Sequence, residues 1–229
     1  DTPHNDSEAA HASVKSRVIG GKPPAAVLMV VGATSQEWAK AGMLNDVDSV
    51  AKAENWDEVL PDGVASASKQ DGKYIAAPVF ISTVNWRYAS LSVLQSAGVD
   101  EPMSWGAFMT SLPRIQKAGY IPIAMGGQDW QETLLFDHVA LGAGGAQYFR
   151  ELLDGNMDTI DSDDTTRVFA AMRALAPYTD AGKAGRSWGD TNNLVISGKA
   201  AYFFMGDWAK GGFLQAKKNP GKDFSCEIS

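Results

Sequence analysis

A carboxylate and an indole stand next to each other at Asp207 and Trp208, directly after an apolar run over residues 200–205. The run is too short for an independent helix and rich in aromatic residues, so it predicts a buried strand, and Gly206 lets the chain turn. Ligands of open α/β sheets bind at the carboxyl ends of strands. A carboxylate accepts hydrogen bonds from hydroxyl groups, and an indole packs against C–H faces. Asp207 and Trp208 are therefore typical of a sugar-binding site. They are equally typical of a core tryptophan beside an aspartate that caps a helix N-terminus.

Two other segments carry aromatic and polar side chains at expected loops. Trp130 and Gln131 follow an expected strand over residues 120–125 across a short polar loop, and Trp188 falls in a glycine-rich loop. Binding sites are commonly built from loops of several elements, so we expect these three side chains to meet Asp207 in one cleft. For Trp130, Gln131 and Trp188, though not for Asp207, packing without any ligand contact is a comparable interpretation.

The elements that would position these loops alternate between strands and helices. Pro78 lies inside one of the expected strands, which indicates an edge or crossover strand. The alternation predicts an α/β fold. Strands are expected over residues 25–31, 74–84, 120–125 and 200–205, and helices within residues 1–17, 36–40, 88–97, 105–119, 130–141 and 165–176.

Composition and charge narrow the classes of partner. The chain has 229 residues, 45% of them hydrophobic and 21% charged, enough for a real core. Its net charge of −7 and the absence of any basic run disfavour nucleic acid and anionic membranes. The chain begins at Asp1 without an initiator Met, which indicates a trimmed sequence. The single cysteine, Cys226, is either a plain buried residue or half of a bridge to another chain.

The sequence lacks the residue spacing of the familiar motifs that bind cofactors and metals. No glycine-rich loop ends in Gly-Lys-Ser or Gly-Lys-Thr, so a P-loop is excluded. Asp154, Asn156 and Asp158 alternate like a calcium loop, but Thr159 stands where Gly is needed and Thr165 where Glu is needed. The three histidines lack metal-ligand spacing. We therefore expect neither a cofactor nor a metal.

Two alternatives to sugar binding remain open. Glycoside hydrolysis also needs aromatic side chains and two carboxylates flanking one bond, and Glu132 with Asp207 is a candidate pair, next to Asp129 and Asp137. Nothing in the sequence pairs these acids. The other alternative is a module that binds only a protein partner.

Four short motifs stand out along the chain. The most specific is Met-Gly-Asp-Trp-Ala-Lys-Gly over residues 205–211, and the others are Asn-Trp at 85–86, Gly-Gly-Gln-Asp-Trp-Gln at 126–131 and Trp-Gly-Asp-Thr-Asn-Asn-Leu-Val at 188–195. Together they resemble the substrate-binding proteins of bacterial ABC sugar importers, most closely the glucose/mannose type, and the resemblance covers nearly the whole chain. It implies a type II periplasmic-binding-protein-like fold with two lobes closing on a sugar, delivery to a membrane permease, and no catalysis.

The resemblance also implies roles for single residues. Asp207 and Trp188 are expected to contact the sugar, followed by Trp130 and Gln131, with Trp208 and Asn85 contacting it or supporting the site. A glucose-like hexose is the expected ligand. We further expect a monomer that is periplasmic or anchored outside the cell by a lipid.

Departures from the family pattern concern the first lobe. By the resemblance, residues 1–81 form part of the first lobe, residues 82–85 the crossover or hinge, and residues 86–229 the second lobe. Members often place a His-Arg pair where this chain has Ser82 and Thr83. The family's N-terminal strand and much of its first lobe are missing, so we expect an incomplete first lobe and weakened sugar binding.

Overall fold

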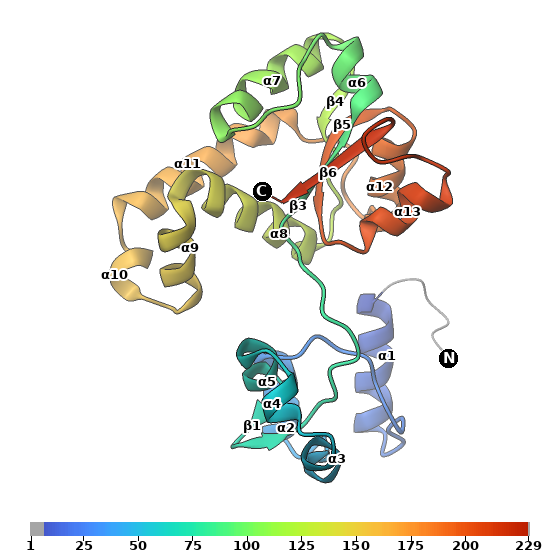
Figure 1. The fold of residues 1–229 in the computed structure, drawn as a ribbon, viewed down its shortest axis with the longest axis vertical. Coiled ribbons are helices and arrows are strands. Elements are labelled where there is room, and N and C mark those ends of the chain that lie inside the picture. Colours follow the sequence, from blue (N-terminus) through green and yellow to red (C-terminus); the bar gives the residue numbers. More distant parts are fainter. Residues whose placement is uncertain (1–6, 229) are drawn as a thin grey trace. The chain divides into compact units, whose positions relative to one another are not determined.

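The computed structural model describes residues 7–228, and the chain divides into two compact units between Ile81 and Ser82 (Figure 1). The first unit consists mainly of short helices, and the second contains a four-stranded sheet with helices around it. Among the described residues, no helix has both the length and the apolar character needed to cross a membrane.

The first unit is built on a small apolar cluster and one hairpin. Tyr74 is buried with Ala51 and Ala65, and the Trp56 ring meets the Tyr74 ring edge-on at 5.2 Å between centroids. The hairpin turns at Asp71 and Gly72, which both have positive φ. The elements are α1 (Ser7–Ile19), α2 (Ala33–Lys40), α3 (Asp48–Ala53), α4 (Trp56–Val59), α5 (Asp62–Ala67), β1 (Lys69–Gln70) and β2 (Lys73–Tyr74).

Two strands expected in the first unit are not formed. Residues 25–31 have no strand partner, and of residues 74–84 only Tyr74 lies in a strand. Several apolar side chains of these runs are exposed to solvent instead, with Val30 81% and Val79 71% exposed. A strand needs a neighbour for its backbone groups, and beyond Tyr74 no described residue of this unit forms a strand ladder with either run. The prediction from apolar runs was therefore wrong here.

The sheet of the second unit has the order β4-β5-β3-β6. The strand β5 (Ala200–Met205) runs parallel to β4 (Ile121–Ile123) and antiparallel to β3 (Trp86–Ser90), which in turn pairs antiparallel with β6 (Phe224–Ile228). Cys226 lies half-buried in β6 opposite Tyr88. The mixed helices and sheet confirm the α/β class.

The strand β3 corrects the helix expected from Tyr88 onward. Residues 88–90 are strand, and the helix α6 begins only at Leu91. Arg87 stands opposite Phe204 on one side and Glu227 on the other, so pairing partners more than 100 residues away hold this segment extended. Tertiary pairing overrides local helical preference at this position.

The buried strand predicted over residues 200–205 is confirmed, because all six of its residues are buried. Tyr202 and Phe204 belong to one apolar cluster, while Phe203 and Met205 belong to a second. The alternation shows that both faces of β5 are covered, as expected for a continuous apolar run.

Helices cover the sheet on both sides. In Figure 1, α12 and α13 lie to the right of the sheet, and α8 to α11 extend to its left. Ser104 caps α7, its hydroxyl accepting from the N–H of Ala107. The bounds are α6 (Leu91–Ser96), α7 (Trp105–Lys117), α8 (Asp129–Val139), the π-helix η1 (Ala140–Gly144), α9 (Gly145–Leu153), α10 (Met157–Ile160), α11 (Asp163–Leu175), the 3-10 helix η2 (Ala176–Tyr178), α12 (Trp188–Ile196) and α13 (Ala209–Gln215).

Candidate functional site

The expected site residues of the second unit gather at one edge of its sheet. Because β4 and β5 are parallel, their carboxyl ends share an edge, and the antiparallel β3 begins there, with Trp86 opposite Met205. We call this the aromatic edge, made of Asn85, Trp130, Gln131, Trp188, Asp207 and Trp208.

Asp207 is fixed at this edge by backbone and side-chain hydrogen bonds. Its N–H donates to the Thr83 carbonyl at 3.0 Å, and its Oδ2 accepts from the Thr83 N–H at 3.3 Å. The Tyr88 hydroxyl donates to the carbonyls of Gly206 and Asp207 at 3.0 and 3.3 Å. Burial raises the pKa of Tyr88 well above its ordinary value, so this hydroxyl remains a donor. The half-buried carboxylate is thus held in one place.

Trp208 lies over the turn that precedes it. A Cβ atom added to Gly206 would lie 2.1 Å from Cζ3 of Trp208, so the ring is packed on the bare glycine. Trp208 is 37% exposed, and the centroid of its ring lies 6.4 Å from that of Trp130 with the planes tilted by 51°. The two indoles therefore form an aromatic pair beside Asp207.

Trp130 and Gln131 lie in the first turn of α8, as expected for residues after β4. Gln131 is only 2% exposed, and its Nε2 donates to Oε1 of Gln128 at 2.8 Å and to the Arg186 carbonyl at 3.4 Å. Trp130 Nε1 and Gln131 Oε1 are buried and have no hydrogen-bond partner among the described residues. A buried polar atom without a partner costs about 1–3 kcal/mol, so a ligand hydroxyl that satisfied either atom would bind favourably.

Trp188 is the first residue of α12 rather than part of a loop, which corrects its expected position. Ser187 caps this helix, its hydroxyl accepting from the Asp190 N–H at 3.2 Å. The Trp188 ring packs against the same apolar cluster as Trp86 and Trp130. A capped helix start, rather than a flexible loop, therefore positions this indole.

The loop before Trp188, residues 180–187, is tied to the end of β4. The Arg186 guanidinium pairs with Asp180 and donates to the Met125 carbonyl at 3.2 Å, and the Gly127 N–H donates to the Arg186 carbonyl at 3.2 Å. Lys183 binds Glu132 of α8 at 2.6 Å. Sequence reasoning missed Arg186, because its partners are identified only once the loop folds back on the strand.

Asn85 lies half-buried one residue before β3, at the same edge. Its neighbour Trp86 donates from Nε1 to the Thr83 hydroxyl at 2.6 Å. Thr83 was also missed by sequence reasoning, and no local pattern marks it, since its contact with Asp207 spans 124 positions.

The candidate acids Glu132 and Asp207 are held by different partners, Lys183 and Thr83. Glu132 is bound to Lys183 and lines a pocket that does not include Asp207. Burial raises the pKa of Asp137. Within residues 7–228, no group of three or more His, Cys, Asp or Glu residues is arranged to hold a metal ion. Asn156 caps the short helix α10, accepting from the N–H groups of Asp158 and Thr159.

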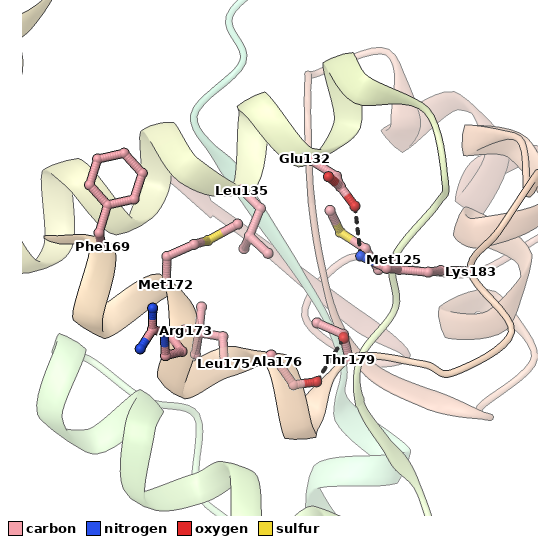
Figure 2. A pocket seen from close by; sticks show the side chains of 10 residues that line it. All are labelled: Met125, Glu132, Leu135, Phe169, Met172, Arg173, Leu175, Ala176, Thr179 and Lys183. Atoms are coloured by element: carbon pink, nitrogen blue, oxygen red, sulfur yellow. Dashed lines mark hydrogen bonds and ion pairs between the residues drawn. The ribbon is translucent and has the colours of Figure 1, made fainter.

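A pocket of about 350 Å³ lies between α8 and α11 (Figure 2). Of the residues singled out in the sequence, only Glu132 lines it. Its lining residues are Met125, Glu132, Leu135, Phe169, Met172, Arg173, Leu175, Ala176, Thr179 and Lys183. The aromatic edge and this pocket therefore share no residue.

Comparison with known proteins gives both a family and a fold. Residues 4–225 match the bacterial extracellular solute-binding protein family. A probable sugar-binding periplasmic protein of Brucella suis is 40% identical over 213 residues, which are 93% of this chain and 50% of that protein. The chain thus spans about half the length of the curated relatives it matches.

Solved structures agree with this result. The bacterial solute receptor AcbH is 25% identical, with a TM-score of 0.62 over 96% of this chain and 55% of AcbH. A protein from a study of xylan utilisation by Caldanaerobius polysaccharolyticus is 20% identical, with a TM-score of 0.79 over 97% of this chain and 57% of its own; it shows the fold alone. The expected type II periplasmic-binding-protein-like fold is confirmed. Because the family match covers nearly the whole described chain, the chain belongs to the bacterial extracellular solute-binding proteins.

Proposed function

We propose that this chain is the sugar-recognising part of a receptor that delivers its ligand to an ABC transporter permease, without catalysing a reaction. The observation that carries the proposal is the meeting of Trp130, Trp208 and an anchored Asp207 carboxylate at one sheet edge. Relatives described as probable sugar-binding periplasmic proteins support both the ligand class and a periplasmic or lipid-anchored location.

Each side chain of the aromatic edge has a physical role in this proposal. The Asp207 carboxylate accepts hydrogen bonds from two sugar hydroxyls, which are stronger than bonds between neutral groups. A sugar C–H face packs on Trp188 or Trp130, while Trp208 and Asn85 support the site. Trp130 Nε1 and Gln131 Oε1, both buried without a partner among the described residues, supply one donor and one acceptor for hydroxyl groups.

The ligand proposed is a glucose-like hexose in the pyranose form. AcbH, the most similar of the structures compared above by identity, is reported to prefer β-D-galactopyranose, which supports a single pyranose ring as the recognised unit. Hexoses differ in the orientation of single hydroxyls, and a site that hydrogen-bonds those hydroxyls discriminates among them strongly.

The two compact units correspond in this proposal to parts of two lobes. Residues 1–81 belong to the first lobe, residues 82–85 form the crossover, and residues 86–229 form the second lobe. The rest of the first lobe would come from a longer protein that acts as a monomer and closes on its sugar by hinge motion.

The proposal is tested by titrating the full-length protein with glucose, galactose, mannose and xylose while following tryptophan fluorescence. We expect a saturable change with at least one hexose. Asp207→Asn is expected to weaken it about 10- to 100-fold, since a charge-assisted hydrogen bond contributes about 1.5–3 kcal/mol. The matched control is Asp100→Asn, an exposed carboxylate of the same unit, which should leave the affinity unchanged.

The alternatives predict different outcomes for the same protein. A glycosidase would hydrolyse a chromogenic glycoside and lose that turnover in Glu132→Gln and Asp207→Asn. A module for a protein partner would show neither turnover nor a sugar-dependent change. Absence of a response to every sugar would exclude the proposed function.

A further inference from the structure

The pocket between α8 and α11 is lined by leucine and methionine side chains, which the aromatic edge lacks. Its inner surface is formed by Met125, Leu135 and Leu175, each less than 6% exposed. Met172 and Phe169 of α11 continue this surface outward, and the Phe169 ring packs against Phe136 at 5.3 Å between centroids. Flexible Met side chains suit an apolar ligand, because they adjust their shape to it.

The charged side chains that line the pocket leave a net positive charge. Glu132 and Lys183 form an ion pair at 2.6 Å and neutralise each other. Arg173 also lines the pocket, is exposed, and forms no ion pair with any residue in the described part of the chain. The lining therefore carries one net positive charge in a chain whose net charge is −7. Such a local excess favours an anion.

The charged and apolar side chains of the pocket lie in separate places, which indicates a ligand with a charged end and an apolar body. Figure 2 shows Arg173 at one end of the pocket near Met172 and Phe169, and the Glu132–Lys183 pair at the other end. The apolar side chains of Leu135 and Leu175 lie between these ends. An anionic group at Arg173 would therefore leave an apolar body to lie along this surface.

We infer that this pocket binds a small monocarboxylate with an apolar chain, of the size of a medium-chain fatty acid. The Arg173 guanidinium binds the carboxylate through a charge-assisted hydrogen bond, and the chain packs against the Met and Leu side chains. A volume of about 350 Å³ falls within the usual range for sites of small organic ligands. This site is separate from the aromatic edge and does not depend on sugar binding.

The probe is octanoate, followed through the methyl signals of ¹³C-methyl-methionine in the complete chain. We expect saturable shifts of the Met125 and Met172 methyl groups, which line the pocket. The methyl groups of Met103 and Met157, which are 81% and 65% exposed, are internal controls and should not shift. Glucose should leave the signals of Met125 and Met172 unchanged.

Two comparisons test whether the Arg173 guanidinium binds the carboxylate of the ligand. Octanol has the same chain without the carboxylate and should bind about tenfold more weakly, as should octanoate to Arg173→Gln, since one charge-assisted bond is worth about 1.5 kcal/mol or more. The control variant is Arg167→Gln, on the same helix, whose side chain pairs with Asp164 outside the pocket. It should bind octanoate as the parent chain does.

A third variant tests the apolar wall. Met172→Gln keeps the length of the side chain but adds a polar end, so it should weaken octanoate and octanol alike. Circular dichroism establishes that each variant is folded. The inference is overturned by equal binding of octanol and octanoate, by shifts spread over Met103 and Met157, or by no saturable shift with octanoate.

Discussion

Asp207 and Thr83 hold each other by two hydrogen bonds, one from each N–H, although 124 positions separate them along the chain. Thr83 lies near the start of the second unit, three positions before β3, and Asp207 follows the strand β5. The proposed ligand contact is therefore bonded directly to the segment that we propose as the crossover.

The first prediction concerns the Thr83 hydroxyl. Thr83→Val removes the acceptor of the Trp86 Nε1–H, whose bond measures 2.6 Å, and should lower the free energy of unfolding by about 1 kcal/mol. Urea denaturation followed by tryptophan fluorescence measures the change. Thr83→Ser keeps the hydroxyl and should lose less. A Thr83→Val variant as stable as the parent chain would contradict this role of the hydroxyl.

The second prediction concerns the packing of Trp208 on Gly206. Gly206→Ala would place Cβ 2.1 Å from the ring, so the indole must move, at a cost of about 1–3 kcal/mol. The double variant Gly206→Ala with Trp208→Ala should lose less than the sum of the single changes, because the clash is gone. Thermal unfolding measures all three variants.

Gly211 provides the matched control for that experiment. No atom lies within 4 Å of a Cβ added there, and the residue is inside α13. Gly211→Ala should therefore stabilise the helix slightly, by up to about 1 kcal/mol. A similar loss at both glycines would contradict the proposed packing.

The third prediction contrasts two ion pairs that hold the loop before Trp188. Arg186 and Asp180 are 19% and 13% exposed, so Arg186→Gln leaves a mostly buried carboxylate unpaired and should cost about 2–3 kcal/mol. Lys183 and Glu132 are 39% and 46% exposed, so Lys183→Gln should cost less than about 1 kcal/mol. Hydrogen exchange of residues 180–187 should accelerate only in the first variant.

A double variant separates the two possible reasons for that loss. Adding Asp180→Asn to Arg186→Gln removes the stranded charge and should restore part of the stability. If the double variant is as unstable as Arg186→Gln, the hydrogen bond from Arg186 to the Met125 carbonyl is the important contact.

The fourth prediction is a pH dependence from His138. Its side chain is 3% exposed, and burial lowers its pKa from the ordinary value of 6.5, partly offset by a hydrogen bond with the Leu134 carbonyl. The unfolded chain then binds a proton at a higher pH than the folded chain. Stability is therefore full above pH 6.5 and decreases as the pH falls below it, by up to about 1.4 kcal/mol per pH unit.

His138→Leu should remove this dependence. Urea midpoints measured between pH 5 and pH 7.5 compare the parent chain with the variant, and His11→Gln, in the first unit, is the control. A parent chain whose midpoint does not decrease below pH 6.5 would contradict the assignment.

Local patterns predicted the parts of the fold whose signal is local. The six apolar residues of β5 and the Ser104 cap of α7 need no distant partner to be recognised. The strand β3 was missed because Arg87 looks unlike a central strand residue until Glu227 and Glu101 are brought to it. The converse error occurred at residues 25–31, where an apolar run has no strand to pair with in this unit.

Part of the candidate site could also be predicted from the sequence. Residue chemistry selected Trp130, Gln131 and Asp207, and the sheet order brings their segments to one edge. The residues that hold them, Thr83 and Arg186, were not found, because their function lies in backbone contacts across long separations. The helical start at Trp188 was hidden by the glycines before it, although Ser187 is a recognisable N-cap.

The uncovered apolar side chains of the first unit have a practical consequence. Leu28, Val30 and the run at residues 79–81 present exposed hydrophobic surface and belong to no strand. Such segments associate readily with each other and with chaperones. Purification of this chain on its own should therefore give concentration-dependent aggregates, and a protease should cut first within these two runs.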